Sequence, residues 1–344
     1  MNSLERVFTA LRREEADRVP ILEWEIHTDV INAIMPGATL FDFIEQMDID
    51  AICVMEDVIY EDVEPGIKRD HFGILRDFRS MSGLYWPVPL HGIIEREEDL
   101  DNYVPPDPHD PRRLSSLRDA VKHFKGKKAI IYMTLSSFLY PSFLRGMVNL
   151  LLDYKLNPNF AKRLTNMVVD YFVELEKLAV KAGADILADG DDYCGKNGPF
   201  MSPADFKEFV LPGLQRVVDV ARDHKMPFIK HMDGDVWAIL DMVIETGIDA
   251  INPIEPAAGM DIGEVKRIYG DKVAIVGNID CATLLTFGTP GDVRQAVKEC
   301  IHVASPGGGH IISSSNMIHR GVKPENYVAM LKAAKEFGRY PIRV

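Results

Sequence analysis

Cysteine is scarce in this sequence, and long apolar runs are absent. The four cysteines, Cys53, Cys194, Cys281 and Cys300, lie far apart and form neither a CxxC pair nor a disulfide framework. No apolar run approaches the roughly 20 residues that are needed to span a bilayer. Residues 1–20 are charged and amphipathic, unlike a secretory signal peptide. We therefore expect a cytoplasmic protein that has no membrane partner.

Positive charge and a dinucleotide loop are lacking as well. The chain has 39 Lys and Arg residues against 52 Asp and Glu residues, and its net charge is -13. With no Lys/Arg run, this balance argues against nucleic-acid binding. No glycine-rich loop follows the first predicted strand, and the triple glycine at 307–309 precedes a strand instead of following one. The 344 residues are 47% hydrophobic, which is ample for a large core.

Short apolar runs recur along the chain, and amphipathic helical patterns separate most of them. Several of these helical patterns end at glycine, as in KAGAD, ETGID and IYGDK. Strand–helix alternation predicts parallel pairing, and eight units predict an α/β fold, a (β/α)8 TIM barrel. An open doubly wound sheet is the alternative. The predicted strands cover residues 19–24, 51–56, 129–134, 185–190, 228–233, 250–255, 273–278 and 310–315.

The segment between the second and third predicted strands is much longer than an ordinary connection. It contains FGILRDF, GLYWPVPLHG and the proline-rich YVPPDPHDP. A connection of this length is uncommon without structure of its own. We predict an inserted hairpin and loop over residues 58–127 that caps the barrel mouth, within a single domain of residues 1–344.

Polar side chains gather where the predicted strands end, which is where TIM barrels carry their chemistry. Burying so many carboxylates is costly unless a cation or shared protons offset the charge. His231 and Asp233 are two residues apart, so in a strand both face the same side. The residues at the strand ends are Glu23, Glu25, His27, Glu56, Asp57, Thr134, Ser136, Ser137, Asp189, Asp191, Asp192, Tyr193, His231, Asp233, Glu255, Asn278, Asp280, Cys281, Ser313, Ser314, Ser315, Asn316 and His319.

Several of these residues have an ordinary structural explanation. Asp192, Asp233 and Asp235 are typical caps of a following helix. His27 and His319 are typical loop hydrogen bonders, and a cysteine such as Cys281 is commonly a small buried apolar residue.

Longer motifs along the chain resemble the uroporphyrinogen decarboxylase superfamily. They are ERVFTALRREEADRVPI, GADILADGDDYCGKNGPFMSPADFKEFVLPGLQRVV, GIDAINPIEP, VAIVGNIDCATLLTFGTPGDVRQAVKECI and PGGGHIISSSNMIHRGVKPENYVAM. Together they cover nearly the full chain. The resemblance implies a (β/α)8 barrel, in agreement with the pattern of strands.

The decarboxylase branch of this superfamily holds its tetrapyrrole with an arginine-rich stretch after the first strand. This sequence has LEWEIHTDV there, with two acids at Glu23 and Glu25 and no arginine. The branch's central aspartate matches Asp57 approximately, and its C-terminal histidine matches His319. The missing arginines disfavour a polyanionic porphyrinogen substrate.

The other branch contains corrinoid-dependent methyltransferases, in which the fifth strand ends in His-x-Cys and a later cysteine completes a zinc site. Here the motif is His231-Met232-Asp233, and serines occupy 313–315. The resemblance therefore implies a methyltransferase with an oxygen-rich Zn²⁺ site. We predict that it transfers a methyl group from a small-molecule donor, a methoxylated aromatic, to the cobalt of a separate corrinoid-binding protein. The alternatives are a metal-independent decarboxylase and a binding protein without activity.

These expectations assign roles to individual residues. The predicted catalytic residues are Asp57, Asp189, Asp191 and His319. The predicted substrate-binding residues are Glu25, His27, Tyr193, Asn278 and Asn316. The predicted metal ligands are His231, Asp233, Glu255 and Cys281. Trp24, Tyr85, Trp86, Phe138, Tyr140 and Tyr193 are predicted to wall an aromatic pocket.

Overall fold

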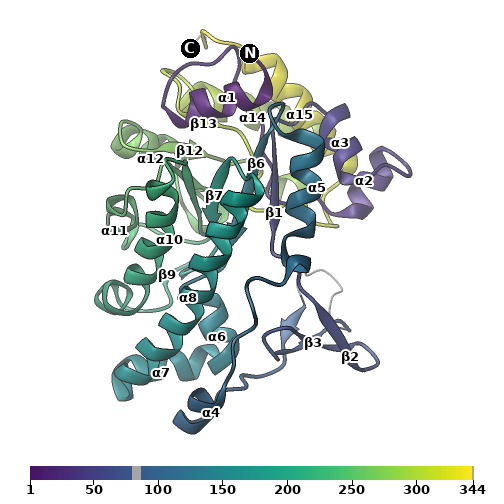
Figure 1. Cartoon of the computed structure of the whole chain (residues 1–344). Coiled ribbons are helices and arrows are strands. Elements are labelled where there is room, and N and C mark those ends of the chain that lie inside the picture. Colours follow the sequence, from purple (N-terminus) through teal and green to yellow (C-terminus); the bar gives the residue numbers. More distant parts are fainter. Residues whose placement is uncertain (80–86, 343–344) are drawn as a thin grey trace.

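The centre of the molecule is a parallel sheet that curls into a barrel (Figure 1). The computed structural model describes residues 1–79 and 87–342. In order around the sheet, the strands are β1 (Ala51–Met55), β6 (Ala129–Thr134), β7 (Ile186–Asp189), β10 (Phe228–His231), β11 (Ala250–Asn252), β12 (Ala274–Val276) and β13 (His310–Ile311). Each pairs in parallel with its neighbours. The predicted (β/α)8 architecture is confirmed.

The predicted first strand at 19–24 is the exception, because it forms only an isolated bridge between Ile21 and Ile312. The Leu22 amide donates to the Ile312 carbonyl at 3.0 Å, and the Asp50 amide donates to the Ile21 carbonyl at 2.8 Å. This segment therefore lies between β13 and β1 and closes the barrel. Pro20 lacks an N–H group, which limits the ladder that the segment can form.

Small and branched side chains fill the barrel interior, and helix α1 (Ser3–Leu11) packs beneath it. Along each strand these residues alternate with residues that face the surrounding helices. In β7, for example, Ile186 and Ala188 point inward while Leu187 belongs to the outer core. The inner cluster consists of Val7, Ala10, Leu11, Leu22, Trp24, Ala51, Ala129, Ile131, Ile186, Ala188, Ile229, Ala250, Ala274, Val276 and Ile311.

Helices cover the outside of the sheet (Figure 1). The longer ones are α5 (Ser115–Phe124), α7 (Met147–Leu156), α8 (Pro158–Ala182), α10 (Leu211–Asp223), α12 (Ile262–Tyr269), α14 (Pro290–Ala304) and α15 (Pro324–Phe337). The shorter elements are α2 (Thr28–Ile34), α3 (Leu40–Gln46), α4 (Glu97–Asn102), η1 (Pro111–Leu114), α6 (Leu139–Arg145), α9 (Pro203–Asp205), η2 (Phe206–Val210), α11 (Leu240–Glu245), η3 (Pro256–Ala258) and α13 (Leu284–Phe287), with a small hairpin of β8 (Cys194–Gly195) and β9 (Gly198–Pro199).

The long connection after β1 contains a separate antiparallel sheet. Its strands are β2 (Tyr60–Glu64), β3 (Ile67–Asp70), β4 (Leu75–Asp77) and β5 (Val88–Pro89). Figure 1 shows β2 and β3 at the end of the molecule away from α1. Because this sheet follows the C-terminal end of β1, it lies at the barrel mouth. Helix α5, also within 58–127, packs against β1 and β6 as a helix of the barrel.

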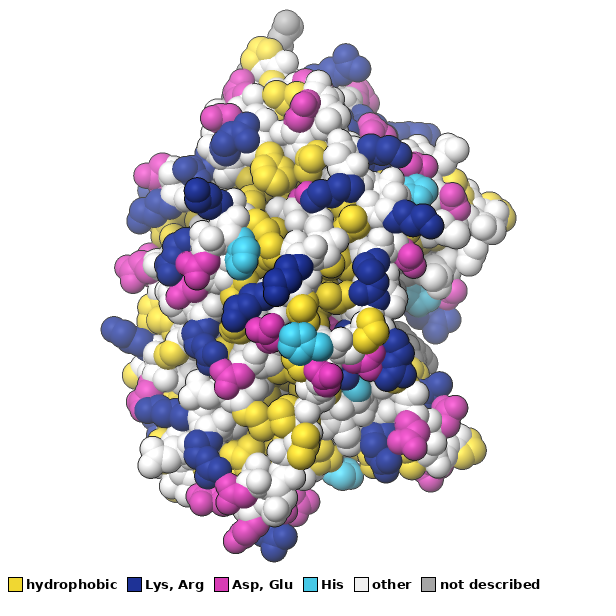
Figure 2. Space-filling model, viewed as in Figure 1, with side chains coloured by type: hydrophobic (Ala, Val, Ile, Leu, Met, Phe, Trp, Pro, Cys, Tyr) yellow, Lys and Arg dark blue, Asp and Glu magenta, His cyan; other side chains and the backbone are white. Residues whose placement is uncertain are grey.

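The surface carries mixed charge. On the face in Figure 2, Lys and Arg side chains are interspersed with Asp and Glu side chains. Within the described ranges, no helix has the length and apolar character needed to cross a membrane.

Candidate active site

A cavity of about 650 Å³ opens at the barrel mouth. This volume is typical of small-molecule sites. Barrel residues at the strand ends form one part of its wall, and the inserted sheet contributes Tyr60, Arg76 and the stretch 87–89. The charged and imidazole groups on the wall are Glu23, Glu25, Glu56, Asp57, Arg76, Asp192, His231 and Asp233.

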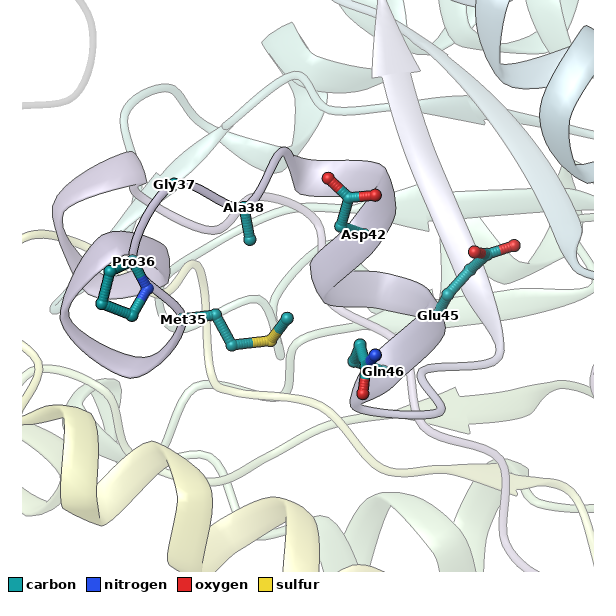
Figure 3. A pocket seen from close by; sticks show the side chains of 7 residues that line it. All are labelled: Met35, Pro36, Gly37, Ala38, Asp42, Glu45 and Gln46. Atoms are coloured by element: carbon teal, nitrogen blue, oxygen red, sulfur yellow. The ribbon is translucent and has the colours of Figure 1, made fainter.

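A second hollow lies on the outer surface between α2 and α3 (Figure 3). Its lining includes Asp42 and Glu45 but no histidine or cysteine. The Asp42 carboxylate accepts hydrogen bonds from Thr39 and caps α3. Both acids are exposed, so we assign no chemistry to this hollow.

Three side chains in the main cavity have the arrangement of a metal site. Asp192, His231 and Asp233 each offer one ligand atom, and these atoms lie within 4.8 Å of one another. The loops after β7 and β10 bring them together, and the Asp233 amide donates to Asp192 Oδ1 at 2.9 Å. Two of the predicted ligands, His231 and Asp233, are thus adjacent, and Asp192 is the third member.

A hydrogen bond from β11 sets the tautomer of His231. His231 Nδ1 lies 2.5 Å from the side-chain oxygen of Asn252. The Asn252 amide nitrogen donates to the Val276 carbonyl at 2.9 Å and to Ser313 Oγ at 3.2 Å, so its oxygen is the acceptor. The imidazole proton is therefore on Nδ1, and Nε2 carries the lone pair that a metal requires. Burial lowers the pKa of His231, which favours this neutral form.

Asp233 sits in an environment that disfavours its negative charge. Burial is the main cause that raises its pKa well above the usual range, and the nearby Asp192 and Glu255 carboxylates add to it. Asn316 donates to Asp233 Oδ2, whereas the buried Oδ1 has no hydrogen-bond partner among the described residues. Oδ1 lies 3.6 Å from His231 Nε2. A cation between these atoms would satisfy Oδ1 and offset the crowded charge.

Glu23 lines the same cavity, and its carboxyl group is held by hydrogen bonds from Ser314. Its carboxyl group accepts from Ser314 Oγ at 2.6 Å and from the Ser314 amide. The residue is 4% exposed, and burial raises the pKa of Glu23 to about 8. This group is therefore protonated at neutral pH and can act as a proton donor.

Two further acids on the wall are held by neighbouring elements. Asp57 accepts from the Ser116 amide at 2.8 Å and from Ser116 Oγ at 2.5 Å, so it caps α5. One oxygen of Glu56 accepts from Arg113 at 3.0 Å and from the Tyr171 hydroxyl. These contacts fix both carboxylates at the cavity edge.

The structure places Asp189 and Asp191 outside this cavity, although we expected them to converge with His231. Asp189 is paired in register with Lys230, so both side chains face the helices while His231 faces inward. Lys230 Nζ lies 2.8 Å from Asp189 Oδ1, and both side chains are fully buried. Asp191 accepts from the backbone amides of residues 137–139 and so holds the loop after β6. Tyr193 donates to Asp189 in this buried network.

Other residues expected at the site make structural contacts outside the cavity wall. His27 caps α2 through the Asp29 amide. The Asn278 side chain donates to the Ile254 carbonyl at 2.8 Å. His319 Nε2 lies 3.2 Å from the Cys281 carbonyl.

The remaining predicted ligands lie beside the triad without joining it. Glu255 accepts from the Gly234 amide at 2.8 Å. Burial raises the pKa of the Cys281 thiol to about 11, which disfavours the thiolate that binds metal.

The expected aromatic wall is present in part. Trp24 and Tyr140 line the cavity, and the Trp24 ring lies 5.5 Å from the His231 ring. Phe138 and Tyr193 are fully buried and do not line it. Tyr85 and Trp86 lie outside the described residues.

Sequence reasoning missed Lys230, Asn252 and Arg76. It interpreted Asp192 mainly as a helix cap, with the acids near Asp189 only as candidates for a third metal ligand. A lysine within the apolar run FIKH was a usable signal, because parallel strands are buried on both faces and a charge there needs a partner. Asn252 had no comparable signal, since its role depends on the neighbouring strand.

The structure is a TIM barrel whose candidate site lies at the C-terminal strand ends, where this class of fold carries its active sites. A family model described as uroporphyrinogen decarboxylase (URO-D) matches residues 39–337. The chain therefore belongs to the uroporphyrinogen decarboxylase family.

Individual relatives fall into both branches of this family. The chain is 32% identical over 170 residues to a uroporphyrinogen decarboxylase of Thioalkalivibrio sulfidiphilus, covering 46% of this chain and 44% of the relative. It is 26% identical over 226 residues to a methylated-thiol–coenzyme M methyltransferase of Methanosarcina mazei, covering 66% and 58%. Thus the chain matches less than two thirds of either relative.

The fold is also that of a solved structure, a methyltransferase from Methanosarcina mazei. The TM-score is 0.79 at 17% sequence identity, over 98% of this chain and 99% of that one. At this identity the likeness establishes the fold alone.

Proposed function

We propose that this protein is the methyltransferase component of a corrinoid-dependent O-demethylase. It takes a methyl group from a methoxylated aromatic compound and passes it to the cobalt of a separate corrinoid-binding protein. The observation that carries this proposal is the Asp192–His231–Asp233 triad, with a neutral imidazole and an unpartnered carboxylate oxygen, in a largely apolar cavity. Homology to a methyltransferase supports it.

The triad fits Zn²⁺, because imidazole nitrogen and carboxylate oxygen both bind this metal. His231 Nε2, Asp233 Oδ1 and an Asp192 oxygen are the atoms that would hold it. When bound, a divalent cation acts as a Lewis acid toward the ether oxygen of the donor. Asn252 orients His231 for this task.

The chain's own residues supply orientation and a proton. Breaking the methyl–oxygen bond leaves a phenolate, whose pKa near 10 makes it a poor leaving group unless it is neutralised. Glu23 is protonated at neutral pH and lines the cavity, so it suits proton donation to that oxygen. Trp24 and Tyr140 supply aromatic faces for the donor ring.

A methyl-transfer assay tests this proposal. Purified protein is mixed with methoxylated aromatics and a cob(I)alamin-carrying protein, and methylcobalamin absorbance is followed. We expect turnover that is lost on chelation and lost in His231→Ala, with the fold unchanged. Asp235→Asn is the matched control, because Asp235 lies outside the triad. Full activity in a thoroughly chelated, metal-free preparation would disprove the metal-dependent mechanism.

Decarboxylation without a metal is the second candidate, because the relatives include uroporphyrinogen decarboxylases and Asp57 lines the cavity. It predicts release of CO₂ from uroporphyrinogen in the absence of both metal and corrinoid. That result, with loss of CO₂ release in Asp57→Asn, would replace the methyltransferase proposal.

A further inference from the structure

Arg76 on β4 is a cation of the cavity wall with unused hydrogen-bonding capacity. The residue is only 6% exposed and lines the cavity. Its Nε donates to Asp70 Oδ2 at 2.8 Å, while Nη1 and Nη2 make no hydrogen bond within the ranges 1–79 and 87–342. Asp70 Oδ1 accepts from the amides of Phe72 and Ile74, at 2.9 Å each. One side of the guanidinium is therefore anchored and the other is available.

Aromatic contacts hold this guanidinium in place. Its central carbon lies 4.6 Å from the Phe143 ring centroid and 5.9 Å from the Tyr140 ring centroid. Phe143 and Tyr140 also line the cavity. A guanidinium fixed by stacking and by one carboxylate loses little further freedom when it binds a second anion.

Among the described residues, the ion pair of Arg76 is with Asp70, which lies outside the cavity wall. Arg76 is also the one Lys or Arg side chain that the described part of the chain places on this wall. Glu23 is neutral at pH 7, Asp57 is bonded to Ser116, and Glu56 is bonded to Arg113. Asp192 and Asp233 face His231.

We infer that Arg76 binds a carboxylate of the methyl donor, so that the substrates are methoxylated aromatic acids. A carboxylate accepts two parallel N–H bonds from the free nitrogens of a guanidinium, which gives affinity and orientation together. The donor ring then lies in the apolar part of the cavity, between the inserted sheet and the strand ends. This substrate class rests on the proposed function, but the carboxylate contact itself does not require methyl transfer.

Calorimetric titration of two matched ligands tests this contact without any corrinoid protein. The ligands are 3,4-dimethoxybenzoate and its neutral amide, 3,4-dimethoxybenzamide. A charged hydrogen bond contributes about 1.5–3 kcal/mol, so we expect the wild type to bind the acid about 10- to 100-fold more tightly than the amide. In Arg76→Gln this preference is expected to fall close to 1 while affinity for the amide is retained.

Two further variants make the test decisive. Arg69→Gln removes the same charge from the exposed face of β3 and should keep the wild-type preference. Arg76→Lys keeps a cation beside Asp70 but loses the planar fork, so its preference should fall severalfold. Equal binding of acid and amide by the wild type, or an unchanged preference in Arg76→Lys, would overturn the inference. If methyl transfer fails but the Arg76-dependent preference is found, the proposed function falls and the carboxylate site stands.

Discussion

Glu23 illustrates how one residue can combine a functional property with a cost in stability. Its pKa of about 8 in the folded protein compares with 4.5 for an ordinary glutamate, and burial is the first cause. Between these two pH values the unfolded chain releases this proton while the folded protein keeps it. Folding therefore binds a proton over this window, and the Glu23 contribution to stability falls as pH rises through it.

Replacing Glu23 with glutamine removes this pH dependence, because glutamine does not ionise. As pH rises from 5 to 8, the free energy of unfolding of the wild type should fall relative to that of Glu23→Gln, by at most about 1.4 kcal/mol per pH unit. Urea denaturation at pH 5, 6.5 and 8 measures the difference. A difference that stays constant with pH would show that Glu23 titrates normally in the folded protein.

At the level of individual residues, the sequence predicted part of the site. The spacing of His231 and Asp233 was informative, because a strand sends residues two apart to the same side. The same rule places Asp189 on the helix side with Lys230. It can be applied only when it is known which alternate residues of the strand face the barrel interior. Asp191 and Asp192 follow the end of β7, where the chain turns and periodicity no longer sets the direction of a side chain.

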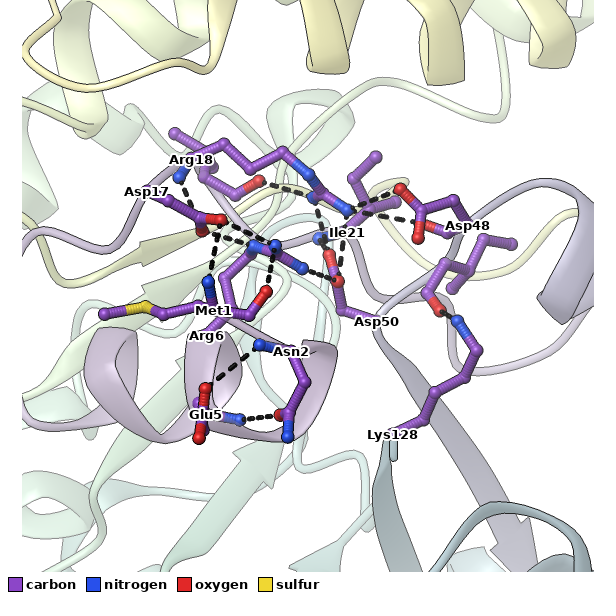
Figure 4. A network of polar contacts seen from close by, with 12 residues as sticks. Met1, Asn2, Glu5, Arg6, Asp17, Arg18, Ile21, Asp48, Asp50 and Lys128 are labelled. Atoms are coloured by element: carbon purple, nitrogen blue, oxygen red, sulfur yellow. Dashed lines mark hydrogen bonds and ion pairs between the residues drawn. The ribbon is translucent and has the colours of Figure 1, made fainter. Parts of the chain in front are cut away.

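At the scale of elements, Asp50 joins the segment that closes the barrel to β1 and α1 (Figure 4). Its fully buried carboxylate accepts from Arg6 at 2.6 Å, from Arg18 at 2.7 Å and from the Ile21 amide at 2.8 Å. These bonds replace the regular ladder that the segment around Pro20 does not form. The eight apolar runs were visible in the sequence, whereas this irregular closure depends on contacts between distant residues.

Removing this carboxylate should weaken the closure strongly. Asp50→Ala leaves two mostly buried arginines without a shared partner, and such losses typically cost about 3–5 kcal/mol. Asp48→Asn is the control, because this exposed acid also pairs with Arg18 and asparagine tolerates its positive φ, so the loss should be no more than about 1 kcal/mol. Urea denaturation of both variants gives the comparison. Equal losses in the two variants would contradict the role assigned to Asp50.

For the whole molecule, the barrel brings the triad together from loops that are about 40 residues apart in sequence, which the pattern of strands alone did not specify. Asp192 follows β7 and Asp233 follows β10, and the direct parallel pairing of these two strands makes them neighbours. A ligand that binds such a site binds the folded chain and not the separated loops. Metal binding and global stability are therefore linked.

This linkage gives a prediction that needs no knowledge of the substrate. Zn²⁺ at about 100 times its dissociation constant should stabilise the chelator-treated wild type by about 2.7 kcal/mol, which corresponds to several degrees in Tm. His231→Ala should lose the shift, because the imidazole ligand is gone. Asp235→Asn should keep it, since Asp235 receives the Trp237 amide outside the triad. Differential scanning calorimetry with and without metal measures the effect. An equal shift in the wild type and His231→Ala would place the metal elsewhere, and no shift in the wild type would leave the acids of the triad as proton-transfer groups alone.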